Sequence, residues 1–227
     1  KMIRQLVTSA TYRQSSVITK EHLAKDPENL YFARAPRFRL MGEFVRDQAL
    51  LISGLLNKKF GGPGVKPYQP AGLWNEVSLD RNRKFVQDKG NKIYRRSMYT
   101  YWKRSSPQPA MLAFDTPSRE ICTVQRQRTN TPMQALVTLN DVQFVEASRF
   151  LAQRVLKSSP QDLPSRVNRM FEIATGRPAD NLRQEVIKKA YDKQKAVFDQ
   201  NPAQADQLLA MGDSPRDKSL NRNEHAT

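Results

Sequence analysis

Apolar side chains recur at helical spacing near the start of the chain. In residues 36–56 the positions that follow this spacing are Met41, Phe44, Val45, Ile52 and Leu55. Proline is tolerated in the first turn of a helix, so we predict that Pro36 opens this helix and that Gly61 and Gly62 end the run. Residues 1–9, with their own apolar face, are interpreted as the last turns of another helix, which residues 11–16 break.

Capping signals mark two helices in the second half of the chain. Thr131, Pro132 and Gln134 have the spacing of a capping box with proline at the first helical position. This pattern predicts a helix that continues through residue 139. Asn140-Asp141 predicts a break and a new cap, followed by a helix to about residue 156.

Shorter periodic segments follow toward the end of the chain. We predict a helix over residues 165–175 that Gly176 closes, and a second over residues 181–198. Asn201-Pro202 is expected to cap a third helix, and Gly212 to end it.

The stretches between these helices hold much of the glycine and proline. Residues 61–74 are expected to form an ordered loop, because they include large side chains such as Trp74 that need burial. Residues 78–92 are polar and charged, which favours an exposed loop or linker. Residues 93–104 leave a short strand and a helical turn open, and residues 105–130 have no clear period.

Taken together, these patterns predict a mainly α fold. It is a helical domain with a long, ordered, Gly/Pro-rich irregular middle and at most a short β element. We divide it into a basic core region, residues 1–156, and a truncated C-terminal helical subdomain, residues 157–227.

The net charge of the chain and its distribution indicate more about possible ligands than the overall composition does. The 227 residues carry 38 Lys and Arg against 22 Asp and Glu, a net charge of +16. Nineteen basic and seven acidic side chains lie in residues 31–130, so +12 of that charge is concentrated there. A field of this kind attracts polyanions, and the 22 arginines suit the forked contacts that phosphate, sulfate and carboxylate accept.

The sequence has few of the residues that metal sites and nucleophilic triads require. Cys122 is the single cysteine, and His22 and His225 are the two histidines, so metal sites and nucleophilic triads lack their usual residues. The sequence contains no metalloprotease, nucleophile-elbow or phosphate-loop motif and no apolar run of about 18 residues that would span a membrane. We therefore predict no metal site, no cofactor and no membrane span in this chain.

The most distinctive group of charged residues lies on one face of the predicted helix. Arg39, Glu43, Arg46 and Asp47 lie three or four residues apart and would share a side of the predicted helix. Glu43 and Asp47 are the weak catalytic candidates, as a carboxylate pair for acid–base work or for a cation. The alternative, which we favour, is an intrahelical ladder of ion pairs that docks against the arginine-rich segment.

A basic and aromatic stretch spans residues 94–104. Its candidate ligand-binding residues are Arg95, Arg96, Tyr99, Tyr101, Trp102, Lys103 and Arg104. Aromatic rings that stack and cations that pair are what sugar rings or unstacked bases need. The same residues would equally suit a half-buried strand whose aromatic rings belong to the core, and both interpretations stay open.

A third cluster precedes the capped helix at residue 131. Arg119, Arg126 and Arg128 lie near backbone N–H groups at a helix start, which together form an anion site. Alternatively, these arginines pair with nearby carboxylates. Cys122 lies between them and is interpreted as a buried, inert thiol rather than a reactive one.

Ordered blocks along nearly the whole chain resemble one known family. They include RAPRFRL at 34–40, EFVRDQAL at 43–50, GGPGVKPYQPAGLW at 61–74, YRRSMYTYWKR at 94–104 and QRTNTPMQALVTLND at 127–141. The family is the planctomycete-associated domain of unknown function fifteen fifty-three. The resemblance implies a large exported protein, often with a c-type cytochrome-like domain, in neighbourhoods rich in sulfatases and polysaccharide-degrading enzymes. It implies haem in a neighbouring domain rather than here, because CxxCH is absent.

These observations lead to one main hypothesis and three alternatives. The main hypothesis is a non-catalytic or accessory module outside the cytoplasm that binds an anionic polymer, such as a sulfated or acidic polysaccharide. The first alternative is part of a carbohydrate-active or haem-coupled enzyme that uses Glu43 and Asp47. The others are nucleic-acid binding, which an exported setting disfavours, and a scaffold that docks other domains of the same larger protein.

Overall fold

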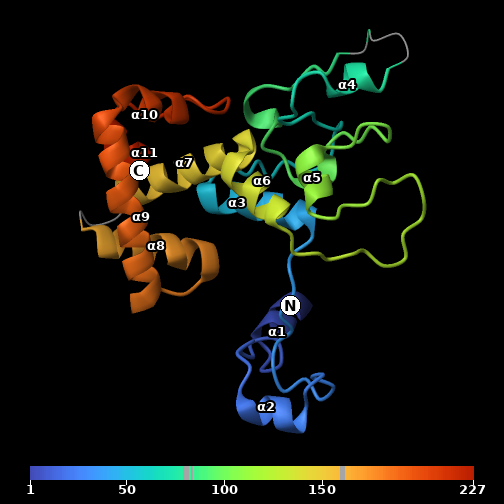
Figure 1. Ribbon diagram of the computed structural model, residues 1–227. Coiled ribbons are helices and arrows are strands. Elements are labelled where there is room, and N and C mark those ends of the chain that lie inside the picture. Colours follow the sequence, from blue (N-terminus) through green and yellow to red (C-terminus); the bar gives the residue numbers. More distant parts are fainter. Residues whose placement is uncertain (79–81, 83, 159–161) are drawn as a thin grey trace. The chain divides into compact units, whose positions relative to one another are not determined.

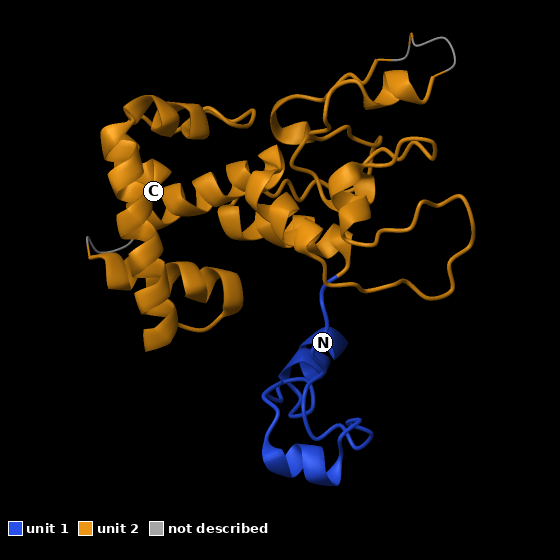
Figure 2. Ribbon diagram, in the orientation of Figure 1, with its two compact units in different colours: residues 1–40 blue, residues 41–227 orange. Residues whose placement is uncertain are grey.

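The computed structural model describes residues 1–78, 82, 84–158 and 162–227. The chain is mainly helical, as predicted, and divides into two compact units, residues 1–40 and 41–227 (Figures 1 and 2). The boundary at residues 156 and 157 that we expected from the sequence stays a prediction.

The first unit contains two short helices, α1 (Met2–Thr8) and α2 (Lys20–Lys25). Helix α1 confirms the prediction for residues 1–9. Helix α2 begins at a capping box in which the Thr19 side chain accepts a hydrogen bond from the His22 backbone. The buried groups that the structure describes in this unit are Asp26 and Arg34, so polar contacts rather than an apolar core hold it together.

Helix α3 (Gly42–Ser53) packs against α7 (Val142–Ser158) in the centre of the second unit (Figure 1). The predicted start at Pro36 is wrong. The helix begins at Gly42, where a Cβ atom would overlap the Thr116 side chain. It ends at Gly54, a left-handed cap with φ +84°, and this end precedes the predicted one at Gly61 and Gly62.

The middle of the chain is ordered but irregular. It contains α4 (Leu73–Glu76), 3-10 turns at Gly90–Lys92 and Ser97–Tyr99, and α5 (Pro109–Ala113). Isolated parallel bridges join Asn57 to Arg95 and Val65 to Thr100, so the segment 93–104 combines a helical turn with β bridges. The exposed loop predicted for residues 78–92 falls partly outside the described residues.

Helix α6 (Pro132–Asn140) follows its capping box, in which the Thr131 backbone N–H donates to the Gln134 side chain at 3.4 Å. The Asp141 carboxylate then accepts from the backbone N–H of Gln143 at 3.0 Å, at the start of α7. Both helices and the break between them are confirmed.

Four helices complete the second unit: α8 (Leu163–Thr175), α9 (Asn181–Gln200), α10 (Pro202–Leu209) and α11 (Arg222–Ala226). Asp162 caps α8, and Gly176 ends it with φ +74°. Helix α10 ends at Leu209, three residues before the predicted end at Gly212.

Small apolar clusters form the core of the second unit. Leu50, Ile93 and Tyr94 pack together between α3 and the irregular middle, and Phe114 and Phe144 pack beside them. A separate cluster around Phe198 and Leu209 holds the C-terminal helices together. Among the described helices, none combines the length and the apolar character needed to cross a bilayer.

Candidate binding groove beside helix α3

Helix α3 presents Glu43 and Asp47 on one side, four residues apart. Arg126 Nη1 donates to both carboxylate oxygens of Glu43, at 2.9 and 3.0 Å. Asp47 accepts a hydrogen bond from the Ser97 backbone at 2.6 Å, and its other oxygen lies 3.6 Å from Arg96 Nε. Of the ladder predicted within the helix, Arg46 Nη1 and Asp47 Oδ1 form an ion pair at 4.0 Å. The closer charged partners of both carboxylates come from two other segments.

Arg46 points from α3 into the interior. Its guanidinium donates to the backbone oxygens of Ile93 and Arg95 at 2.6 and 2.7 Å. Burial lowers the pKa of Arg46 to about 10, and Asp47 and Asp141 oppose that shift. These contacts fix residues 93–97 against α3, which positions Arg96 beside Asp47.

A groove of about 330 Å³ lies between α3, the turn at residues 96–98 and the loop that follows α5. Its lining residues are Met41, Glu43, Phe44, Asp47, Arg96, Met98, Arg119 and Arg126. Candidates that the sequence placed in three separate clusters thus meet at one site. Three arginines against two carboxylates give the groove a net positive charge.

Arg119 occupies a distinct position in this groove. Its guanidinium lies 4.6 Å above the Trp102 ring, and Trp102 Nε1 donates to the Ser118 backbone oxygen at 2.7 Å. The backbone of Arg119 is left-handed, with φ +65°, which holds the residue in a sparsely populated conformation. No carboxylate partner reaches Arg119 from the residues that the structure describes.

The loop between α5 and α6 continues the groove outward. Residues 124–128 and Met41 line an adjoining hollow of about 620 Å³, so Arg126 and Arg128 both border it. This loop extends away from the helices of the second unit (Figure 1). Cys122 is exposed on it, so the burial expected for this thiol is wrong.

Arg95 and Tyr99, two candidates of the basic and aromatic stretch, stabilise the fold. Arg95 is buried and donates to the backbone oxygens of Gly61 and Pro63, while its guanidinium stacks 3.8 Å from the Tyr99 ring. The Tyr99 hydroxyl accepts from the Gly61 backbone at 2.8 Å. Both residues therefore hold the glycine-rich loop, and the Arg95 guanidinium does not face the groove.

The remaining candidates lie farther along the same stretch. Tyr101 and Lys103 contact the Trp74 ring, on another side of the segment from Arg96. Arg104 is exposed. Within the described ranges, no group of three or more His, Cys, Asp or Glu side chains is arranged to hold a metal ion.

Sequence reasoning missed a buried carboxylate on α7. Glu146 is fully buried and accepts hydrogen bonds from the hydroxyls of Tyr68 and Tyr94, both at 2.8 Å. It also accepts from the Ser214 backbone at 2.9 Å. Burial together with the Glu146 charge raises the pKa of Tyr94 to about 12.

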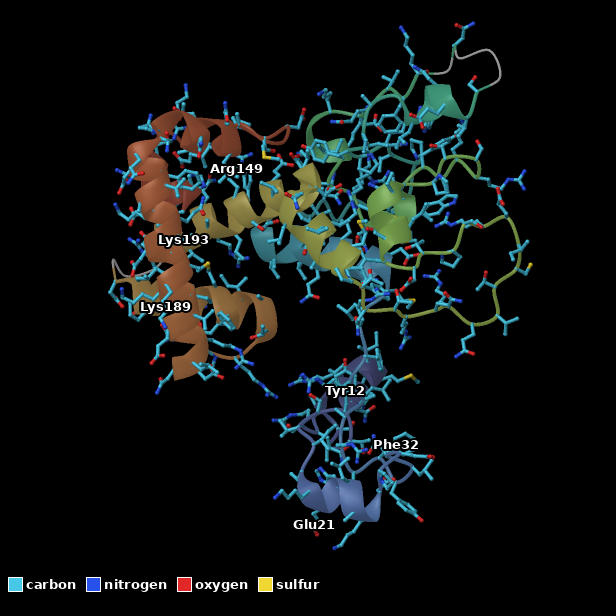
Figure 3. The ribbon with its side chains drawn as sticks, viewed as in Figure 1. Tyr12, Glu21, Phe32, Arg149, Lys189 and Lys193 are labelled. Atoms are coloured by element: carbon cyan, nitrogen blue, oxygen red, sulfur yellow. The ribbon has the colours of Figure 1, made fainter. Side chains whose placement is uncertain are left out.

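This network joins three distant parts of the second unit. Arg149, labelled in Figure 3, lies one turn along α7 and donates to the backbone oxygen of Met211 at 3.2 Å. Gln143, Glu146 and Arg149 form a polar row at three-residue spacing, and this row was the available sequence signal. Glu146 holds these segments together from a fully buried position, which suits a structural role.

The chain belongs to the family described as PSD1, a protein of unknown function (DUF1553), whose sequence profile matches residues 1–191. This match confirms the resemblance stated from the sequence. No match was found among curated proteins, nor among solved structures.

Proposed function

We propose that residues 41–227 form a non-catalytic module that binds an anionic polymer, such as a sulfated or acidic polysaccharide, along the groove beside α3. The observation that carries the proposal is Arg119, stacked on Trp102 at the groove with no carboxylate partner among the described residues. A guanidinium above an indole ring keeps N–H donors available for sulfate or carboxylate oxygens.

Arg96 and Arg126 support the same ligand class. Their side chains stay 47% and 38% exposed although each is paired with a carboxylate of α3. A guanidinium has five N–H donors, and these pairs use only some of them. The remaining donors are available to anionic groups spaced along a chain.

The pairing of Glu43 and Asp47 weighs against the enzymatic alternative. A general base or nucleophile needs a lone pair that reaches the substrate. Glu43 is held by Arg126 through both oxygens, and Asp47 is held by a backbone N–H and Arg96.

The proposal also includes a setting outside the cytoplasm and neighbouring domains of a larger protein, one of them able to carry haem. These parts of the proposal rest on the family resemblance.

Retention on a heparin-like resin tests the proposal. Arg119→Ala is expected to elute at lower salt and to bind a soluble heparin fragment about tenfold more weakly. Loss of one charge-assisted hydrogen bond costs about 1.4 kcal/mol, which corresponds to that factor. Arg119→Lys keeps the charge but loses the planar fork, so it should fall between wild type and Arg119→Ala. Arg126 is left intact because its removal would leave the Glu43 charge unpaired.

The matched control removes one positive charge elsewhere. Lys189 and Lys193 are exposed on α9 (Figure 3), and α9 lies on the side of the second unit away from the loop between α5 and α6 (Figure 1). Equal shifts for Lys189→Ala and Arg119→Ala would reduce the effect to net charge and contradict the groove. A duplex DNA that bound as tightly as heparin at the same salt would favour the nucleic-acid alternative instead.

A further inference from the structure

A second cavity lies beside Trp74. Aromatic side chains from separate segments pack around the Trp74 ring. The Phe85 ring meets it edge-on at 5.3 Å between centroids, and the Tyr101 ring lies at 5.9 Å. Gly72, at φ +87°, turns the chain into α4 and sets Trp74 in place. Aromatic walls of this kind are typical of ligand pockets.

Lysines surround the same ring. Lys103 Nζ lies 4.7 Å from the Trp74 centroid, and Lys66 Nζ lies 5.3 Å from the centroids of both Trp74 and Tyr101. The Lys103 ammonium is buried, and no hydrogen-bond partner reaches it from the part of the chain that the structure describes. Buried charges in proteins are ordinarily paired, so this ammonium lacks the anion that its surroundings call for.

The cavity measures about 360 Å³ and has Lys84 and Phe85 in its wall. Three more wall residues carry a buried polar atom with no hydrogen-bond partner in the described ranges: Gln69 Nε2, Trp74 Nε1 and Asn75 Oδ1. Two of these atoms are donors and one is an acceptor. Buried polar groups in folded proteins are nearly always satisfied, so three exceptions around one cavity point to a missing partner.

We propose that this cavity binds one pyranose ring that carries an anionic group, either a carboxylate or a sulfate. Ring hydroxyls both donate and accept, so they can satisfy the unpartnered atoms of Gln69, Trp74 and Asn75 together. The apolar ring faces fit against Trp74 and Phe85. The anionic group pairs with Lys84 in the cavity wall, and the buried Lys103 ammonium lies 4.7 Å from the centroid of the Trp74 ring that forms part of that wall.

This inference rests on the proposed function and names the unit of the polymer that would be recognised. One continuous segment connects the two sites, because Arg96 and Met98 line the groove while Tyr101 and Lys103 contact Trp74. Met98 and Lys103 are five positions apart, which spans at most about 18 Å when the chain is extended. A polymer in the groove can therefore place one of its rings in the cavity.

Fluorescence titration tests the cavity directly. The chain has two tryptophans, so Trp102→Phe leaves Trp74 as the reporter, and calorimetric titration of the wild-type chain with the same saccharides repeats the measurement with the Arg119–Trp102 contact of the groove intact. A galacturonic acid trimer or a sulfated disaccharide is expected to change the Trp74 emission in a saturable way. Lys84→Met should weaken that binding at least tenfold because it removes a lysine of the cavity wall, and it should preserve the fold because the Lys84 side chain is exposed. Lys189→Met on α9 is the matched control and should bind as the parent does.

Other outcomes would overturn the inference. If neither acidic saccharide gives a saturable change, the proposed ligand class is wrong. If neutral maltotriose binds equally well, the cavity does not recognise an anionic group. Equal binding of sodium sulfate alone would reduce the cavity to an anion site, and tighter binding of adenosine monophosphate would assign it to a base. If Arg119→Ala still weakens heparin retention while the trimer fails to bind, the cavity inference fails and the proposed function stands. Trimer binding without any Arg119 effect would contradict the groove alone.

Discussion

Gly212 lies where the chain passes closest to the buried Glu146 carboxylate. Its φ is +98°, and a Cβ atom there would overlap the Glu146 side chain. We expect Gly212→Ala to lower the free energy of unfolding by about 3–4 kcal/mol, because it adds left-handed strain and displaces a buried charge from its hydrogen bonds. Urea denaturation at neutral pH measures this loss.

Gly176 provides the matched control for that substitution. It is also left-handed, at φ +74°, but a Cβ atom there would have open space around it. Gly176→Ala should therefore cost only the backbone strain, roughly 1 kcal/mol. Equal losses for the two variants would mean that the Glu146 network contributes nothing beyond backbone strain at Gly212.

Single residues also show where sequence reasoning reaches its limit. The basic and aromatic stretch made Arg95 and Arg96 equivalent candidates, yet Arg95 is buried against the loop at residues 61–63 and Arg96 lines the groove. The partners of Arg95 are backbone oxygens more than thirty residues away. No local pattern encodes such contacts, so the residue types were predictable from sequence and their division between core and groove was not.

The Asp115 side chain closes the base of the loop between α5 and α6. Asp115 accepts hydrogen bonds from the backbone N–H of Thr129 at 2.7 Å and from its hydroxyl at 2.9 Å. Asp115 lies at φ +58°, a conformation that glycine adopts freely, so Asp115→Gly removes the carboxylate without strain. We expect trypsin to cut at Arg119, Arg126 and Arg128 at least fivefold faster in this variant, the factor for about 1 kcal/mol of lost local stability.

Mass spectrometry of the early fragments assigns each cut to its site. Asp192→Ala on α9 is the control, because it breaks an exposed ion pair with Lys188 far from this loop. Unchanged cleavage at the three loop arginines in Asp115→Gly would show that other contacts close the loop.

Elements with local signals were predicted well, and elements fixed by distant contacts were not. Helices α6 and α8 carry their caps in the sequence and begin and end near the predicted residues. The start of α3 is set by the close approach of Gly42 to Thr116, which no helical period reveals. The irregular middle is likewise fixed by long-range pairing, as when the Val65 backbone bonds to Tyr99 and Tyr101 at 2.8 and 2.7 Å.

Burial is unevenly divided across the molecule. Every buried hydrophobic side chain in the described residues lies in the second unit, from Leu50 to Ala226. The first unit has short helices, and its large apolar side chains are exposed, including Ile3 at 76% and Tyr31 at 83%. Helices of six or seven residues are marginal in water without tertiary packing. Folding free energy should therefore reside almost entirely in residues 41–227.

Deletion of residues 1–40 tests this division. The chain 41–227 should unfold cooperatively, with a Tm within about 4 °C of the full chain, the shift that roughly 1 kcal/mol produces in a domain of this size. A peptide of residues 1–40 should show no cooperative transition by circular dichroism. The effect of Arg119→Ala on heparin retention should persist in the shortened chain, because the groove lies within it. Loss of cooperative unfolding in 41–227 would show that the first unit completes the core of the second.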